Sequence, residues 1–175
     1  MMTALARKGG MAAVGLLAFA SVIYAAGLRV NMTASLPLGI YWRTYDPLVR
    51  GSYVIFCPPT DNAVFDLARE RRYIDYGNCT GRFGTLMKRV AGLPGDQIDV
   101  DSDGVRVNGS RLPNSTPRTT DRGGHPMPIV RLHTTLPPDD LLLMSDYTPW
   151  SFDARYFGPI ARSALRAQVK PVWTW

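Results

Sequence analysis

The feature that most constrains the folding of this chain is an uncharged apolar stretch near its N-terminus. Met11 to Leu28 are 18 consecutive residues without a charged side chain, just enough for a helix that spans a membrane. Arg7 and Lys8 precede the stretch and favour a cytoplasmic N-terminus. We therefore expect a cytoplasmic tail over residues 1–10, a transmembrane anchor over residues 11–28, and a domain outside the cytoplasm over residues 29–175.

A cleaved secretory signal is the alternative interpretation of the same stretch. The small residues Ala18 and Ala20, or those near Ala25, offer cleavage sites. Arg29 follows the stretch directly and weakens the charge asymmetry across it. Both interpretations place the remainder of the chain outside the cytoplasm.

Length and charge narrow the classes to which the remainder can belong. A chain of 175 residues is expected to form one domain with a real core. The chain has 20 Lys and Arg against 14 Asp and Glu, but the positive charges are dispersed, apart from a group at Arg69, Arg71 and Arg72. Nucleic-acid binding needs a basic stripe, so we expect no nucleic-acid partner, whereas attraction to membrane lipid stays open.

Cys57 and Cys79 are the two cysteines of the chain. In an oxidising compartment, two cysteines in one small domain favour one disulfide, and a pair of buried free thiols is the alternative. The bond would close a loop of about twenty residues and stabilise the fold by roughly 3 kcal/mol. We expect no metal site, because His125 and His133 do not have the spacing of metal ligands.

The pattern of apolar and polar residues predicts a mostly β fold with few helices. Strands are expected at residues 52–57, 85–91, 97–101, 105–108, 129–133, 141–144 and 168–173, and the third and fourth form a hairpin around Asp103-Gly104. A helix is expected from Asn62 to about Tyr73 with Asp61 as its N-cap, and a short one over residues 160–167. Residues 114–128 are polar and predict a long surface loop.

Ser35 and Lys88 stand out as a candidate catalytic pair. A serine hydroxyl is a poor nucleophile until a base takes its proton. Lys88 is flanked by apolar residues, and an apolar environment lowers a lysine pKa because it disfavours the charged form. Ser35 lies at most ~25 Å from Leu28 even in an extended chain, so the reaction would occur close to a membrane. Such a pair needs no metal or cofactor.

Four segments resemble, in order, the sequence boxes of the signal peptidase I family. Ser35 to Gly39 is similar to the box of the nucleophile, and Gly51 to Val54 is similar to the Gly-Asp-x-Val box. Lys88 to Asp96 matches the lysine box almost residue for residue. The last box corresponds to Ser145-Asp146 and Ser151 to Gly158, with Ser145 in place of the usual glycine. The ordered set is far more specific than any single box.

Within this family the chain is most similar to the conjugal-transfer peptidases of the TraF type, which are short and carry a cysteine-containing flap. The resemblance implies a mostly β, antiparallel fold of the signal-peptidase and LexA kind, with a small helical flap over about residues 58–84. It also implies a membrane-anchored serine endopeptidase of the bacterial inner membrane with its catalytic domain in the periplasm. The expected substrate is a leader-bearing protein or a conjugative prepilin, which some members of the family also cyclise.

The resemblance also implies roles for individual residues. Ser35 is the expected nucleophile and Lys88 the general base. Asp153 is expected to act by positioning, with Arg155 compensating its charge, because a charged carboxylate beside Lys88 would raise the lysine pKa. Further expected roles are a hydrogen bond from Ser151 to Lys88, an oxyanion contact from the Thr33 hydroxyl beside the Ser35 N–H, and a structural role for Asp146.

Recognition of the substrate is expected to use an extended peptide added to a strand edge, at Leu36 to Tyr41 and at Leu86 to Arg89. Trp42, Trp173 and Trp175, with Tyr41, would lie at lipid headgroups or else belong to the core.

Three other functions compete with this interpretation. A general leader peptidase would share the chemistry, but such enzymes often carry larger insertions. A self-cleaving repressor of the LexA type would need an N-terminal DNA-binding helix set, where this chain has an apolar stretch. A non-catalytic component of a conjugation or secretion channel would not need both Ser35 and Lys88.

Overall fold

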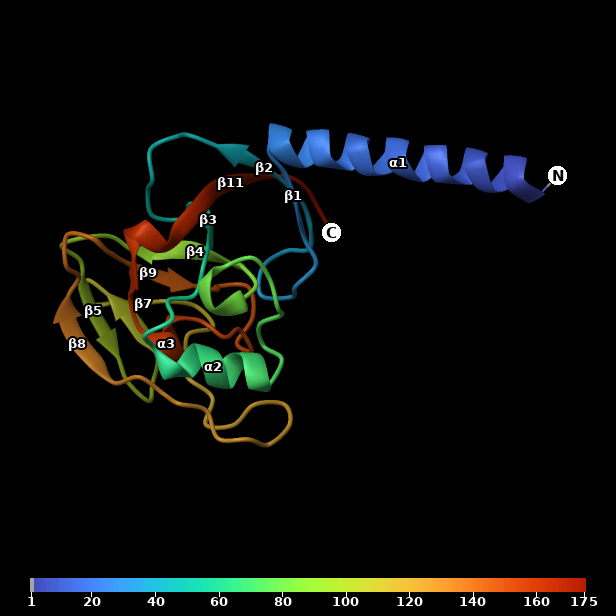
Figure 1. The fold of residues 1–175 in the computed structure, drawn as a ribbon. Helices are drawn as coiled ribbons and strands as arrows, with labels where there is room; N and C mark the ends of the chain where they lie inside the picture. Colours follow the sequence, from blue (N-terminus) through green and yellow to red (C-terminus); the bar gives the residue numbers. More distant parts are fainter. Residues whose placement is uncertain (1) are drawn as a thin grey trace.

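The computed structural model describes the backbone of residues 2–175 and the side chains of residues 10–175. Antiparallel strands make up most of the domain, and one long helix extends away from it (Figure 1). The helices are α1 (Met2–Ala26), α2 (Ala63–Glu70) and α3 (Ala154–Phe157). The strands are β1 (Leu28–Asn31), β2 (Gly39–Thr44), β3 (Tyr53–Phe56), β4 (Leu86–Gly92), β5 (Gln97–Val100), β6 (Val105–Val107), β7 (Ser110–Arg111), β8 (Leu132–Thr135), β9 (Asp140–Met144), β10 (Ile160–Ala161) and β11 (Leu165–Thr174). The prediction of a mostly β, antiparallel fold is confirmed.

Helix α1 ends two residues earlier than the apolar stretch. Gly27 adopts a φ of +122°, which L side chains rarely adopt, and β1 begins at the next residue. Across the side chains that the structure describes, no helix is long and apolar enough to cross a bilayer. The predicted transmembrane anchor over residues 11–28 is therefore not confirmed. The predicted tail over residues 1–10 falls mainly on residues whose side chains lie outside the described part, Arg7 and Lys8 among them.

The larger sheet places Lys88 in its interior. Its strand order is β1-β2-β11-β3-β4-β9-β10, and every neighbouring pair is antiparallel. Residues of β4 alternate in burial, with Lys88, Val90 and Gly92 buried. At Gly92 the neighbouring strand comes so close that an added Cβ would lie 2.9 Å from Leu142 Cβ, which explains why this position of the lysine box carries glycine.

The smaller sheet, in the order β7-β6-β5-β8, contains the predicted hairpin. β5 pairs with β6 through Ile98 opposite Val107 and Val100 opposite Val105. All four side chains are buried in the same core as β9. Full burial of one such side chain contributes about 1.5–3 kcal/mol, so the alternating pattern determines which face of the hairpin turns inward.

The segment between the two cysteines is packed against the core. Asn62, and not the predicted Asp61, caps α2 by accepting a hydrogen bond from the Val64 N–H at 3.1 Å. Phe65 is fully buried, and its ring centroid lies 5.1 Å from that of Phe157. The predicted disulfide between Cys57 and Cys79 is present.

Two other expectations are corrected by the pairing of strands. The predicted helix over residues 160–167 is instead β10, a short 3₁₀ turn and the start of β11, because β11 inserts between β2 and β3 and gains ladder hydrogen bonds on both sides. The strand expected at residues 129–133 lies at Leu132–Thr135. Residues 114–128 form the predicted loop, which is closed by one isolated bridge between Thr120 and Pro126.

Candidate active site

Lys88 is a buried lysine in the middle of β4. Its side chain is 2% exposed, and it lies opposite Val54 of β3. Burial lowers the pKa of Lys88 from 10.5 to about 8, while the charge of Asp153 acts to raise this pKa and the charge of Arg155 acts to lower it. With this pKa, about a tenth of Lys88 is neutral at pH 7 and about half at pH 8, and this neutral form can accept a proton.

Ser35 lies in a half-buried turn between β1 and β2. Ser35 and Lys88 both line one cavity of about 530 Å³, which also borders Leu86, Ser151 and Phe152. Among the described residues, the backbone N–H of Ser35 has no hydrogen-bond partner, so it is free to donate to a ligand in the cavity. The turn thus presents a hydroxyl and an N–H donor from the same residue.

Asn31, the last residue of β1, holds this turn in place. Its buried side-chain amide donates to the carbonyl oxygens of Thr33, Leu36 and Pro37 at 3.0–3.1 Å. Its carboxamide oxygen accepts from the Thr33 N–H at 3.2 Å. Asn31 thus ties together the five residues from Thr33 to Pro37, a role that was not predicted from the sequence. The Asn-x-Thr spacing, typical of an Asx turn, is the signal that would have indicated it.

The Thr33 hydroxyl is near Ser35 but already has a partner for its proton. It donates to Asn31 Oδ1 at 2.8 Å, and its oxygen lies 3.3 Å from Ser35 Oγ. A hydroxyl has one proton, so in this arrangement Ser35 is the donor to Thr33. The expected oxyanion contact from Thr33 would require its bond to Asn31 to break first.

Ser145 and Asp153 connect the last sequence box to the turn that carries Ser35. Ser145 is fully buried, and its hydroxyl donates to the backbone carbonyl of Ser35. The Ser145 N–H donates to Asp153 Oδ2 at 3.2 Å. Ser145 replaces the usual glycine of this box, and its added hydroxyl makes a direct contact with the backbone of Ser35.

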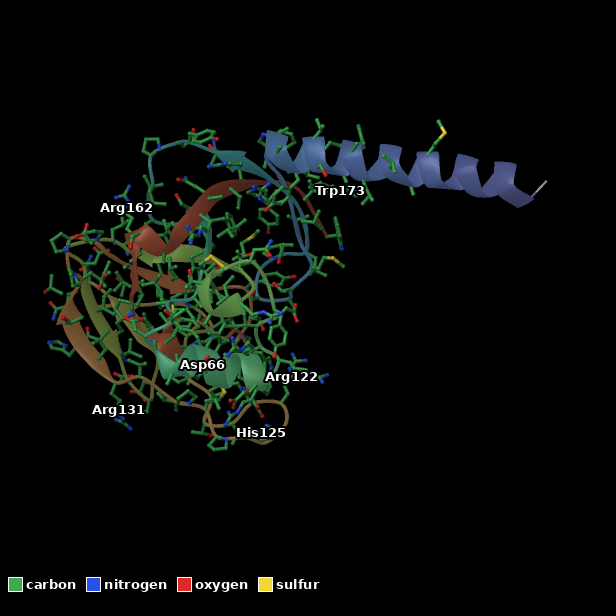
Figure 2. All side chains as sticks on the ribbon, in the orientation of Figure 1. Asp66, Arg122, His125, Arg131, Arg162 and Trp173 are labelled. Atoms are coloured by element: carbon green, nitrogen blue, oxygen red, sulfur yellow. A yellow bond between two sulfur atoms is a disulfide. The ribbon has the colours of Figure 1, made fainter. Side chains whose placement is uncertain are left out.

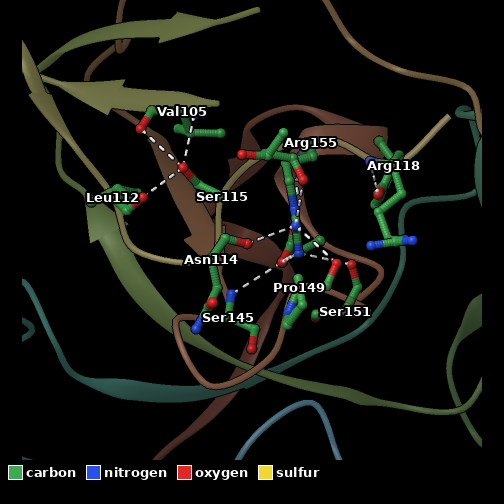
Figure 3. A network of polar contacts seen from close by, with 12 residues as sticks. Val105, Leu112, Asn114, Ser115, Arg118, Ser145, Pro149, Ser151 and Arg155 are labelled. Atoms are coloured by element: carbon green, nitrogen blue, oxygen red, sulfur yellow. Dashed lines mark hydrogen bonds and ion pairs between the residues drawn. The ribbon is translucent and has the colours of Figure 1, made fainter. Parts of the chain in front are cut away.

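Arg155 is the centre of a fully buried polar network (Figure 3). It forms a two-point ion pair with Asp153, with Nε to Oδ1 at 2.7 Å and Nη2 to Oδ2 at 2.8 Å. Its remaining donors reach the carbonyl oxygens of Asn114, Thr116, Pro149 and Ser151 at 2.9–3.2 Å. Both buried charges are therefore paired with each other and hydrogen-bonded. Asp153 forms its ion pair with Arg155 and not with Lys88.

Ser151 lines the cavity beside Lys88, but the expected hydrogen bond between them is not formed. Ser151 Oγ is the one buried side-chain nitrogen or oxygen without a partner among the residues whose side chains are described. An unpaired buried hydroxyl costs about 1–3 kcal/mol, so a ligand or side chain in the cavity that bonds to Ser151 would recover that cost. Asp146, expected to be structural, pairs with Arg89 on the other face of β4.

The two predicted strand edges differ in accessibility. β2 is paired with β1 on one side and β11 on the other, so Gly39 to Tyr41 offers no free edge. β4 is different, because β9 pairs with it only from Arg89 onward. Leu86 to Lys88 therefore has an unpaired side next to the cavity, where an extended peptide can add as a strand.

The aromatic residues expected near lipid divide into two groups. Tyr41 is fully buried and belongs to the core, where its hydroxyl donates to the Pro37 carbonyl at 2.7 Å. Trp42, Trp173 and Trp175 are exposed, and the rings of Trp173 and Trp175 lie 5.3 Å apart. Trp173 lies beneath the C-terminal part of α1 (Figure 2).

The far wall of the cavity comes from the long loop over residues 114–128 and from the segment before α3. Arg118 stacks on the indole of Trp150, with its guanidinium carbon 3.6 Å from the ring centroid. Neither residue was predicted as part of the site. Their one signal is the length of the loop, because long loops without secondary structure are commonly functional.

The chain matches one protein family and several curated proteins along nearly its whole length. The family model described as "Signal peptidase, peptidase S26" matches residues 6–175. The chain is 48% identical to the plasmid transfer protein TraF of Escherichia coli, over 94% of this chain and 93% of that protein. It is 37% identical to the conjugal transfer protein TraF of Agrobacterium tumefaciens (strain 15955), over 94% of this chain and 92% of that protein. A crystal structure of a signal peptidase I from Enterococcus faecalis aligns with a TM-score of 0.41 and 17% identity, over 73% of this chain and all of that one.

Proposed function

Because the chain belongs to the signal peptidase family S26, and is thus a signal-peptidase-like serine protease, we propose that it cleaves exported proteins with a Ser35–Lys88 dyad. The observation that carries this proposal is the shared cavity, in which a half-buried serine and a fully buried lysine of lowered pKa occur together. Lys170, the other lysine whose side chain is described, is exposed and does not lie in such a buried apolar environment.

The first step is proton transfer from the Ser35 hydroxyl to the neutral Lys88 amine as Ser35 Oγ attacks the scissile carbonyl carbon. The resulting oxyanion is stabilised by the free Ser35 N–H, which needs no reorganisation to donate. When the tetrahedral intermediate collapses, the C–N bond breaks and the Lys88 ammonium gives its proton to the leaving amine. An acyl-enzyme ester on Ser35 remains.

The ester has two possible fates. Water, deprotonated by Lys88, would release a linear product with a new carboxylate. Alternatively, the amino terminus of the same substrate would attack the ester and close the polypeptide into a ring. The cyclic product is one water lighter than the cleaved linear product, so intact mass spectrometry distinguishes the two reactions.

Asp153 and Arg155 act in this proposal by positioning. The two charges neutralise each other. Asp153 accepts a hydrogen bond from the Ser145 N–H, and the Ser145 hydroxyl in turn donates to the carbonyl of Ser35, so the ion pair positions the Ser35 backbone through Ser145. This arrangement keeps the carboxylate from restoring the normal pKa of Lys88, which a direct ion pair would do. Thr33 and Ser151 are supporting residues in this proposal: the Thr33 hydroxyl accepts a hydrogen bond from Ser35, and the Ser151 hydroxyl is available to hydrogen-bond with Lys88.

The proposed substrate is a conjugative pilin precursor. Relatives that match along nearly the whole chain are named as plasmid transfer and conjugal transfer proteins. A general leader peptidase is the second candidate within the same chemistry. Incubation of the purified protein with a prepilin and, in parallel, with an unrelated leader-bearing secreted protein separates these two substrate classes.

We also propose that the domain works at a membrane surface in the periplasm. The described part of α1 exposes apolar side chains including Leu16, Leu17 and Phe19, and Trp173 and Trp175 are exposed as well. The disulfide between Cys57 and Cys79 favours an oxidising compartment. Co-flotation of the full-length protein with anionic vesicles tests the first part, and thiol labelling without reductant tests the second.

The dyad is tested with two variants and two matched controls. Ser35→Ala and Lys88→Met should each abolish cleavage of the prepilin in the full-length protein, because each removes one partner of the first proton transfer. Ser163→Ala and Lys170→Met change the same residue types at exposed positions and should retain it. Cleavage that survives Ser35→Ala would show that Ser35 is not the nucleophile.

A further inference from the structure

The cavity that holds Ser35 and Lys88 has a strongly basic mouth. Arg71, Arg118 and Arg122 all line it, from the end of α2 and from the long loop over residues 114–128. Arg122 lies near the end of α2 (Figure 2), and its neighbour His125 lies on the same loop. A peptide bound in this cavity therefore lies near these guanidinium groups as well as near Ser35 and Lys88.

Two of these arginines are held by a single aromatic ring. The guanidinium carbon of Arg118 lies 3.6 Å from the centroid of the Trp150 ring, and that of Arg122 lies 5.0 Å from it. A stacked guanidinium keeps its N–H donors in the plane of the group, where they can still bind a planar anion at two points. The backbone N–H of Arg118 also donates to the Tyr156 hydroxyl at 3.0 Å, which fixes the base of this side chain.

These charges are not compensated within the protein. Among the residues whose side chains are described, no carboxylate forms an ion pair with Arg71, Arg118 or Arg122. The other arginines near the site differ in this respect, because Arg155 is paired with Asp153 and Arg89 with Asp146. Arg71 donates to the backbone carbonyl of Pro126 at 2.8 Å, which ties the loop to α2 without neutralising the charge.

Among the residues whose side chains are described, Asp121 is the one carboxylate that lines the cavity, and both of its oxygens accept hydrogen bonds. It accepts hydrogen bonds from the Tyr73 hydroxyl, from the Gly123 N–H at 2.7 Å, and from the His125 N–H at 2.8 Å. The Tyr73 hydroxyl first, and then the contacts with His125 and Gly123, hold the pKa of Asp121 well below its usual range. Asp121 is therefore ionised and shapes the loop, but its oxygens form no ion pair with Arg118 or Arg122, and one negative charge faces three arginines in this cavity.

Two uncompensated positive charges on one ring repel each other, since their separation is within about one Debye length of ~8–10 Å. An anion that contacts both guanidinium groups reduces this repulsion and gains charge-assisted hydrogen bonds. A carboxylate is the anion that a peptide substrate supplies. On the basis of the proposed peptidase function, we propose that Arg118 and Arg122, held on Trp150, bind a substrate carboxylate at the mouth of the cavity.

Such a carboxylate has two sources in a peptide, an acidic side chain near the scissile bond or the free C-terminus of a short leaving segment. The test measures binding to the full-length Ser35→Ala protein, so that no probe is turned over. The probes are fluorescein-labelled alanine decapeptides with an amidated C-terminus, in which Glu or Gln occupies each position in turn. A third set carries Ala throughout and a free C-terminal carboxylate.

We expect at least one Glu peptide, or the free-acid peptide, to bind roughly 5- to 10-fold more tightly than its neutral counterpart. The preference should disappear when Arg118→Gln and Arg122→Gln are added to the Ser35→Ala protein. It should persist with Arg131→Gln and Arg162→Gln, which remove the same charge from exposed positions far from Arg122 (Figure 2). It should also weaken in high salt.

Each outcome decides the proposal. A preference confined to the Glu series assigns an acidic side chain, and one confined to the free acid assigns a C-terminus. Equal binding of charged and neutral peptides, or a preference that survives the Arg118 and Arg122 substitutions, would overturn the carboxylate site. Failure of the proposed peptidase function is a separate result, because it would appear as prepilin cleavage that does not depend on Ser35.

Discussion

Replacing Lys88 with methionine should make the protein more stable while it abolishes activity. The pKa of Lys88 is lowered by burial from 10.5 to about 8. A difference of one in pKa corresponds to about 1.4 kcal/mol, so the folded state loses about 3 kcal/mol when it holds this amine in its charged form. Methionine has a similar length and no charge, so it removes this cost.

The effect should depend on pH in a defined way. Below about pH 8 the lysine is charged in both the folded and the unfolded protein, and the whole cost of about 3 kcal/mol is present. Between about pH 8 and 10.5 the unfolded chain binds more protons than the folded one, so the wild type gains stability as the pH rises. The advantage of Lys88→Met should therefore be largest at pH 7 and should disappear toward pH 10.5.

Thermal unfolding of the full-length protein at pH 7 and pH 10 measures this difference. We expect a midpoint of thermal unfolding roughly 6–12 °C higher for Lys88→Met at pH 7, the size that about 3 kcal/mol produces in a protein of this length. Lys170→Met is the matched control, because Lys170 is exposed and pairs only with Asp46 at the surface. It should change the stability by less than ~1 kcal/mol. Destabilisation by Lys88→Met, or an equal gain at both pH values, would refute the reasoning.

Three further predictions concern the same network and the disulfide. The kcat/KM for a fluorogenic peptide should rise about tenfold per pH unit below about pH 8 and level off above it, because only neutral Lys88 accepts the proton; a flat profile from pH 6 to 9 would contradict this. Asp153→Asn should lower the free energy of unfolding by about 3–5 kcal/mol in urea, because it leaves Arg155 buried without its counter-charge, and should shift the pH profile toward lower pH, because Asp153 acts to raise the pKa of Lys88. Cys57→Ser combined with Cys79→Ser should cost about 3 kcal/mol in the same assay, and reductant should produce the same loss in the wild type but none in the variant.

The sequence predicted the elements whose local pattern agrees with their final environment. The hairpin of β5 and β6 alternates apolar and polar residues, and the same residues turn inward in the structure. Burial of Lys88 followed from its apolar neighbours, and the strong resemblance of its sequence box identified the segment. The helix predicted over residues 160–167 was wrong, because Ala161, Ala164 and Leu165 favour a helix locally, whereas strand pairing along β11 is decided by distant residues.

Contacts that join distant segments could not be predicted from the sequence. Ser145 reads as a departure from the usual glycine, and its bond to the Ser35 carbonyl links residues 110 positions apart. The stacking of Arg118 on Trp150 joins a polar loop to the segment before α3. Asn31 differs, because its contacts are local and the Asn-x-Thr pattern indicated them in principle.

The short strand β1 has a consequence for where a substrate is cut. Its four residues, of which Asn31 is the last, follow α1 directly and pair along their whole length with β2. The Asn31 side chain is hydrogen-bonded to the turn that carries Ser35. At ~3.3 Å per residue, this strand is a stiff spacer of about 13 Å. If α1 binds to a membrane surface, β1 thereby sets the distance between that surface and Ser35. The enzyme would thus select its cleavage point by measuring distance, in addition to the side chains that it contacts.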